Sequence, residues 1–408
     1  MTPAPTRPRP APAGYSRRIS LTERSYLMGA LLAPPMAIQV FVEGFGALDP
    51  DRLARAVATA SAACPGARVV RRGPSWVDSG TNPPVTVVDG TRIDRTTFDG
   101  AALRRPFDPA RGPNCEVLLL TGEPATLVFR VFHAVMDGKG VMAWITEVFR
   151  ALRGESALGA ADTDTEEGLV ARFAPGAATP PADTAAGRDW PSPFDALAVS
   201  GTTADSGSDL DWIWRRHTVP GSHVGLTAKA AVAITAATGA AGRFMVPVNL
   251  RRHDPSVRST ANLTLPVLLD VPPGATWRAT QGRLVQALME RRELTADGPH
   301  DGATRLASLA ALAPGLADAR SAGERRSRYR ASAILSELGK PDLPSLCGAG
   351  FTARTVYSLP MYVPYAPAFL TMYQLPDRVE IGLSCRSGPG MGAKADALLS
   401  LVEAALNS

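Results

Sequence analysis

The chain has 408 residues, of which 45% are hydrophobic and 20% are charged, and its formal net charge is +5. This length predicts two domains or lobes, and the composition is that of a folded globular protein. The basic residues are mostly Arg, they are scattered, and no aromatic strip runs among them, which argues against nucleic-acid binding. The mild positive charge suits solubility alone, or equally an acidic carrier protein or a coenzyme A phosphate as partner.

The four cysteines form no CxxC pair and have no His at ligand spacing. We therefore expect buried free thiols, with neither a zinc site nor a disulfide framework. Residues 1–15 are rich in Pro and lack the apolar segment of a signal peptide, so we expect a disordered tail. Residues 27–42, the most apolar stretch, are broken by prolines and too short to span a bilayer, which favours a cytoplasmic protein with no membrane span.

The first half, residues 16–154, contains strand and helix patterns in alternation. After a strand at residues 36–43, Asp49 and Pro50 are typical of a helix start, and Cys64 begins the segment that ends this helix. Two apolar runs separated by a turn predict a buried hairpin, and an amphipathic helix that ends at Gly154 follows it. The expected strands after residue 66 are 67–72, 85–88, 115–120 and 125–132.

A polar turn, HAVMDGKG, joins the hairpin to this helix. Its first residue, His133, stands at a strand end that faces a helix N-terminus, where a neutral imidazole can accept a proton near pH 7. Asp137 and Gly138 complete the spacing HxxxDG. A lone His after a buried strand is also typical of a hydrogen-bonded core residue, so the spacing alone leaves both interpretations open.

Residues 155–208 are rich in Ala, Thr, Pro, Gly and Asp, which predicts a linker or crossover with little regular structure. The remaining residues, 209–408, return to regular helix and strand patterns and predict a second lobe. The expected helices cover residues 226–238, 277–294 and 393–406, and the expected strands cover residues 244–249, 263–271, 356–365, 368–374 and 379–385.

Several segments, taken in order, resemble the condensation-domain and chloramphenicol-acetyltransferase superfamily of acyltransferases. They are RRISLTERSYL, the long segment that contains HxxxDG, VPVNLRRH, STANLTLPVLLDV and YAPAFLTMYQLPDRVEIGLSCR. The resemblance covers most of residues 16–408 apart from the linker. It implies an α/β fold, a two-lobed pseudo-dimer in which each lobe is a mixed β-sheet flanked by helices, with an active-site tunnel between the lobes.

The resemblance also implies roles for single residues. His133 matches the catalytic histidine, and Gly138 matches a glycine that lets the backbone approach the substrate and can take φ > 0. Asp137 matches an aspartate that turns away from the site and pairs with an arginine. Arg251, at the end of a predicted strand, is the expected partner and Arg252 the second candidate; a solvated strand end remains the alternative for Arg251.

Three further residues are candidates for lining the tunnel: Asn262, Tyr357 and Ser358. Asn262 could equally cap a turn, and the other two rest only on their position before the closing strands. Phe132 departs from the pattern, because many members carry another His there. That position serves packing, so an aromatic side chain is compatible with it.

The implied function is a stand-alone acyltransferase of specialised-metabolite or lipid biosynthesis. It would transfer an acyl group from a carrier-protein or coenzyme A thioester to an amine or hydroxyl, with acyl-CoA or acyl-phosphopantetheine as donor substrate and no metal or tightly bound cofactor. The first alternative is a non-catalytic domain that recruits a partner or carrier protein; Phe132 motivates it, whereas His133 and Asp137 argue against it. The second is a serine hydrolase, but the sequence has no GxSxG elbow.

Overall fold

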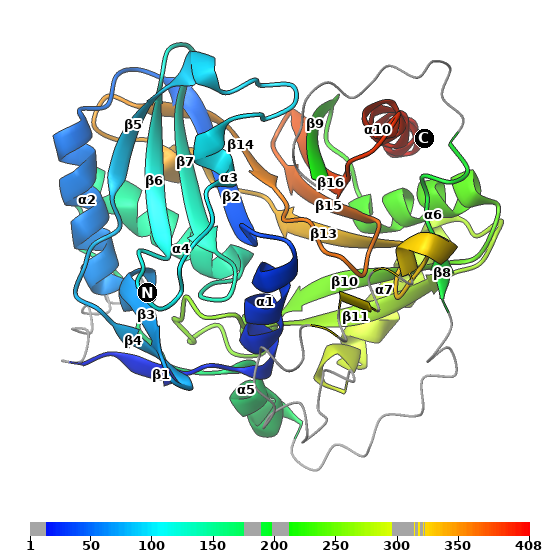
Figure 1. The fold of residues 1–408 in the computed structure, drawn as a ribbon, viewed down its shortest axis with the longest axis horizontal. Helices are drawn as coiled ribbons and strands as arrows, with labels where there is room; N and C mark the ends of the chain where they lie inside the picture. The colour runs from blue at the N-terminus through cyan, green and yellow to red at the C-terminus, as the bar shows by residue number, and fades with distance from the viewer. Residues whose placement is uncertain are drawn as a thin grey trace, which may run out of the picture.

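The computed structural model describes residues 14–174, 189–197, 212–295, 314, 317–318, 321 and 323–408. These residues form two lobes, each built on a mixed β-sheet with helices packed against it (Figure 1). The expected α/β, two-lobed fold is therefore confirmed. Within the described ranges, no helix combines the length and the apolar character needed to cross a membrane.

The sheet of the first lobe has five strands in the order β14-β2-β7-β6-β5. Strands β6 and β7 form the predicted antiparallel hairpin, whereas β5 runs parallel to β6, which makes the sheet mixed. A small sheet of three short strands, in the order β1-β4-β3, lies beside it (Figure 1). The bounds are β1 Ser16–Arg18, β2 Ala37–Phe45, β3 Val69–Arg72, β4 Ser75–Asp78, β5 Val85–Asp89, β6 Cys115–Thr121 and β7 Ala125–Phe132.

Local signals in the sequence account for the helices of this lobe. Helix α2 (Pro50–Ala63) begins after Asp49, whose side chain accepts a hydrogen bond from the Arg52 backbone N–H. Helix α1 (Leu21–Leu32) begins with a capping box formed by Ser20 and Glu23. Helix α4 (Gly138–Leu152) buries its apolar stripe in the core of the first lobe. The short helices are η1 Pro65–Arg68, η2 Gly90–Arg92 and α3 Ala101–Arg104.

The second lobe has a mixed six-stranded sheet in the order β11-β10-β13-β15-β16-β9. Its central strands β10, β13 and β15 run parallel, and the outer pairs are antiparallel. Helix α6 ends at Thr238 as predicted, and Gly239 after it adopts a left-handed conformation with φ of 62°. The bounds are β9 Trp212–Pro220, α6 Leu226–Thr238, β10 Gly242–Asn249, η3 Leu250–His253, β11 Thr264–Val271, α7 Trp277–Met289, η4 Arg292–Leu294, β13 Ala333–Gly339, η5 Leu343–Leu346, β15 Ala368–Gln374, β16 Arg378–Arg386 and α10 Met391–Leu406.

The structure differs from the sequence expectations in several places. Strands β1, β4, β9 and β13 are not among the predicted strands, and the helix expected over 277–294 is divided into α7 and η4. The segment expected to have little regular structure contains α5 (Glu166–Phe173) and β8 (Trp190–Pro191), which pairs with β12 (Arg328–Tyr329). Residues 175–188 and 198–208 of this segment lie outside the described residues. Of the expected tail, residues 1–13 also lie outside them, and Tyr15 is buried.

The largest difference concerns the strand expected at residues 356–365. The observed strand, β14 (Thr352–Leu359), ends before Pro360 because proline lacks the N–H that a sheet ladder needs. It lies in the sheet of the first lobe, antiparallel to β2, although it comes from the second half of the chain (Figure 1). Residues of both halves therefore meet along this strand.

The start of α4 is a second place where the halves approach closely. A Cβ atom on Gly140 would lie 2.1 Å from the backbone oxygen of Thr260, a distance that no real Cβ contact shows. Only glycine fits here without moving the backbone of one half away from the other.

We predict that Gly140→Ala lowers the free energy of unfolding by about 1–3 kcal/mol, the usual cost of overpacking a filled site. The matched control is Gly282→Ala in α7, where an added Cβ would meet nothing within 4 Å. Because alanine favours helix more than glycine does, the control should gain about 0.5–1 kcal/mol. Urea unfolding of both variants measures the difference. Equal stability of the two variants would show that the approach at Gly140 is not tight.

Candidate active site

His133 directly follows β7 and contacts a small cavity between the two halves of the chain. Its backbone N–H donates to the Met36 carbonyl at 3.0 Å, which fixes the strand end. Tyr26 of α1 stacks on the imidazole with ring centroids 4.0 Å apart and an interplanar angle of 22°. The cavity measures about 50 Å³, and its other lining residues include Ile38 and Val40 of β2, Gly138, Ser336 and Leu338 of β13, and Ser358–Met361.

The surroundings of His133 favour its neutral form. Burial lowers the pKa of the imidazole from its ordinary value of 6.5, because the charged form loses hydration. Its Nδ1 atom has no hydrogen-bond partner among the residues that the structure describes. An imidazole that is neutral at pH 7 has one nitrogen available as a proton acceptor.

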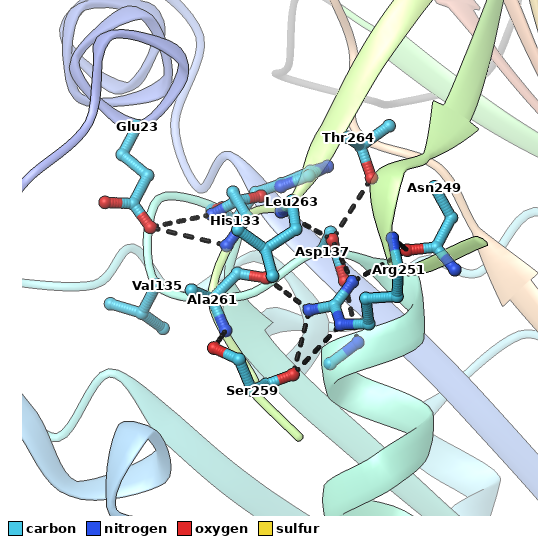
Figure 2. A network of polar contacts seen from close by, with 12 residues as sticks. Glu23, His133, Val135, Asp137, Asn249, Arg251, Ser259, Ala261, Leu263 and Thr264 are labelled. Atoms are coloured by element: carbon cyan, nitrogen blue, oxygen red, sulfur yellow. Dashed lines mark hydrogen bonds and ion pairs between the residues drawn. The ribbon is translucent and has the colours of Figure 1, made fainter. Parts of the chain in front are cut away.

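The Asp137 carboxylate lies four residues further on and joins the two lobes. It caps α4 by accepting from the Gly140 N–H at 2.7 Å. Three donors from the second half also reach it: Arg251 Nη1 at 2.8 Å, the Leu263 N–H at 2.8 Å and Thr264 Oγ1 at 3.1 Å (Figure 2). Burial alone would raise the pKa of Asp137, but the Arg251 charge and these hydrogen bonds hold it below its ordinary value.

Arg251 connects Asp137 to several residues from the second half of the chain. Besides Asp137 it contacts Asn249 Oδ1 at 3.0 Å, the Ser259 carbonyl at 2.9 Å and the Ala261 carbonyl at 2.7 Å (Figure 2). The guanidinium thus fixes the loop between η3 and β11 against the turn that carries His133. Arg252, the second candidate for this pair, contacts Glu293 instead, at 3.3 Å.

A second buried network holds the same turn from the other side. Asn262 donates from Nδ2 to the His133 carbonyl at 2.8 Å, and its backbone N–H donates to Glu23 Oε1 at 3.4 Å. Glu23 pairs with Arg17 at 2.6 Å, and both side chains are fully buried. Arg17 Nη2 in turn donates to the Val135 carbonyl at 2.9 Å. The carbonyls of His133 and Val135 are therefore both held by buried side chains.

The structure brings together some of the predicted site residues and separates others. Gly138 and Ser358 line the cavity with His133. Gly138 has no positive φ, in contrast to the expectation; a Cβ there would lie 3.2 Å from Leu338 Cδ2. Asn262 lies beside the His133 backbone and does not line the cavity.

Tyr357 was expected to line the tunnel, but it does not line the cavity at His133. Successive residues of a strand point to opposite faces, and Ser358 takes the face toward His133. Tyr357 therefore lies in a different core cluster, where it stacks on Phe41 and donates from Oη to Glu43 Oε1 at 2.7 Å. Phe132 is buried in the core of the first lobe, as a packing residue should be.

Sequence reasoning missed several residues at this site, among them Tyr26 and Ser336. Tyr26 lies in a segment noted for its resemblance, but no spacing indicates that α1 reaches His133. Ser336 belongs to β13, a strand that was not predicted. Both contacts depend on how segments far apart in the chain come together.

The fold of the chain matches several solved structures. No protein-family model and no curated protein matches the chain. The first condensation domain of the calcium-dependent antibiotic synthetase, in complex with a substrate analogue, matches with a TM-score of 0.65 at 15% identity, over 96% of this chain and 95% of that one. The chain has the condensation-domain fold.

Two further structures agree with this assignment of the fold. The starter condensation domain of rhizomide synthetase, as a variant in complex with C8-CoA, matches with a TM-score of 0.63 at 14% identity, over 96% of this chain and 95% of that one. The condensation domain of the monacolin K polyketide synthase matches with a TM-score of 0.59 at 12% identity, over 97% and 98%. At these identities the likeness establishes the condensation-domain fold, and the chemistry has to be argued from the site.

We predict that Asp137→Ala destabilises the protein by about 3–5 kcal/mol, because it leaves Arg251 as a buried charge without its partner. The expected signs are a lower melting temperature and a poor soluble yield. Arg252→Ala is the control, since that side chain is 40% exposed and Glu293 keeps its contact with His253. An Asp137→Ala variant as stable as wild type would contradict a structural role for this ion pair.

Proposed function

We propose that the protein is an acyltransferase in which His133 is the general base. It would move an acyl group from a thioester to an amine or hydroxyl acceptor. The observation that carries this proposal is the position of a buried imidazole, whose pKa burial lowers, at a small cavity lined from both halves of a condensation-domain fold. Such a cavity can hold the reacting ends of two substrates together, away from bulk water.

The chemistry needs little beyond a base and a confined site. A thioester carbonyl is already activated, but an amine or hydroxyl is a poor nucleophile while it keeps its proton. His133 would take that proton as the nucleophile attacks the carbonyl carbon, and the C–S bond would then break. The imidazolium would return the proton to the leaving thiolate. Because the acceptor attacks the thioester directly, no acyl-enzyme forms.

The oxyanion of the tetrahedral intermediate requires hydrogen-bond donors. The backbone N–H of Gly140, at the start of α4, already donates to Asp137 and is not available. Ser336 and Ser358 line the same cavity as His133, and we propose their hydroxyl groups as the donors.

The size of the cavity indicates the class of donor substrate. A cavity of about 50 Å³ accommodates the reacting atoms but not a whole substrate, so the rest of each reactant must lie outside it. An acyl-CoA or an acyl-phosphopantetheine on a carrier protein meets this requirement, because its thioester stands at the end of a long arm. One structural neighbour is described with C8-CoA bound, which supports the same class of donor.

We predict that His133→Ala reduces turnover by about a hundred- to ten-thousand-fold, the usual effect of removing a general base, while the fold survives. The assay offers a panel of acyl-CoA and acyl-pantetheine thioesters with amine and alcohol acceptors. It measures thiol release together with the mass of the acylated acceptor, which separates transfer from hydrolysis.

His217→Ala is the matched control, because His217 lies on β9 beside Glu403 and does not line the cavity. It should keep the wild-type rate. A folded His133→Ala variant that retained half of its turnover or more would refute the assignment of the base. A wild-type protein that acylates no acceptor but binds a carrier protein would favour recruitment over catalysis.

A further inference from the structure

A second and larger cavity adjoins the one at His133. It measures about 410 Å³, and Tyr26 is part of its wall. Because Tyr26 also stacks on the imidazole, a single side chain connects the wall of the large cavity to the proposed base. Met361 lines both cavities. The two spaces are therefore neighbours along α1 and the segment after β14.

Part of the wall of the large cavity is apolar. It is formed by Met28 of α1 and Met36, and by Met361, Val363 and Pro364 after β14. Methionine side chains are flexible and adapt to chains of varied shape. The volume falls within the roughly 300–1,000 Å³ that is usual for small-molecule sites. The side chains of Met28, Met36, Met361, Val363 and Pro364 carry no N–H or O–H group for the two amides of a pantetheine arm, so an apolar body fits this part of the wall better.

The cavity also carries positive charge. Arg326, Arg328 and Arg330 contribute to its lining from one short segment, and all three residues are exposed. Arg326 pairs with Asp189 at 3.5 Å. Across the described part of the chain, neither Arg328 nor Arg330 forms an ion pair. Two guanidinium groups are thus available to a ligand at the solvent side of an apolar cavity.

We propose that this cavity binds the acceptor substrate, and that the acceptor is an amphipathic molecule of a defined kind. Its apolar body lies among the methionines, an anionic group at its outer end meets Arg328 and Arg330, and its hydroxyl or amine at the inner end passes Met361 toward His133. The anionic group is a carboxylate or a phosphate, since guanidinium binds both in the same manner. The placement of the hydroxyl or amine at His133 rests on the proposed function, whereas binding of the molecule in the cavity does not.

The test is equilibrium binding by titration calorimetry with ω-hydroxydodecanoate, dodecyl phosphate and dodecanediol as probes. The first two carry the anionic group and the third does not, and comparing the first two separates carboxylate from phosphate recognition. We expect both anions to bind, and the diol to bind at least about tenfold more weakly. The double variant Arg328→Ala/Arg330→Ala should weaken the anions by about ten- to a hundredfold, as the loss of hydrogen bonds to charged groups does, and leave the diol unchanged.

Arg325→Ala is the matched control, because Arg325 is exposed in the same segment but does not line the cavity. Its affinity for the anions should equal that of wild type. Ser25→Trp, which places a large ring in the cavity from α1, should abolish binding of all three probes. Calorimetry measures binding without turnover, so a protein that acylates no acceptor in the thioester assay could still bind these probes, and a failure of the proposed catalysis would leave this result intact.

Two results would overturn the proposal. One is binding of the diol as tight as that of the anions, or anion binding that the arginine variant does not change, since either would remove the role of the charge. The other is the absence of binding by every probe, or binding that Ser25→Trp leaves intact, since either would remove the cavity as the site.

Discussion

The structure depends on one buried carboxylate. Asp137 accepts four hydrogen bonds, one from the start of α4 and three from the second half of the chain. An ionised group can remain buried only while such donors surround it. The two halves must therefore stay in register at this point, and His133, four residues earlier in the same turn, is placed by the same requirement.

This arrangement separates the residue that holds the site from the residue that faces the cavity. Asp137 and Arg251 form no part of the cavity lining, whereas His133, Gly138 and Ser358 do. The second network, from Arg17 through Glu23 to Asn262, holds the carbonyl side of the turn. The backbone of this turn is held from both lobes, and burial lowers the pKa of the imidazole. A neutral base is what the proposed attack on a thioester requires.

The parts of this fold that the sequence predicts are those set by neighbouring residues. Asp49 before Pro50, the hairpin around its turn, and Gly239 after an Ala-rich helix are local signals, and each element begins or ends where expected. Contacts between distant segments are different. The placement of β14 in the sheet of the first lobe depends on pairing with β2, which no local pattern encodes.

In the candidate site, too, the features set by neighbouring residues were predicted, whereas those set by contacts between distant segments were not. The spacing of His133 and Asp137 is local. The resemblance to the acyltransferase superfamily implied an arginine partner for Asp137, and Arg251 was the candidate because it follows a predicted strand. The faces of β14 could not be assigned, because Tyr357 and Ser358 are both buried and their alternation carries no polar signal. The start of α4 packs closely against the backbone of Thr260, which lies 120 residues further along the chain. This contact requires a glycine at position 140, and no local pattern indicates it.

The most direct test of this account is the protonation state of His133, measured by NMR on protein labelled in its histidines. The chain has only five histidines, so the spectrum of the His133→Ala variant identifies the signal. The account predicts that this imidazole stays neutral as the pH falls through 6.5, the ordinary pKa of histidine, and becomes protonated only below it. Protonation at or above pH 6.5 would contradict the neutral base on which the proposed chemistry rests.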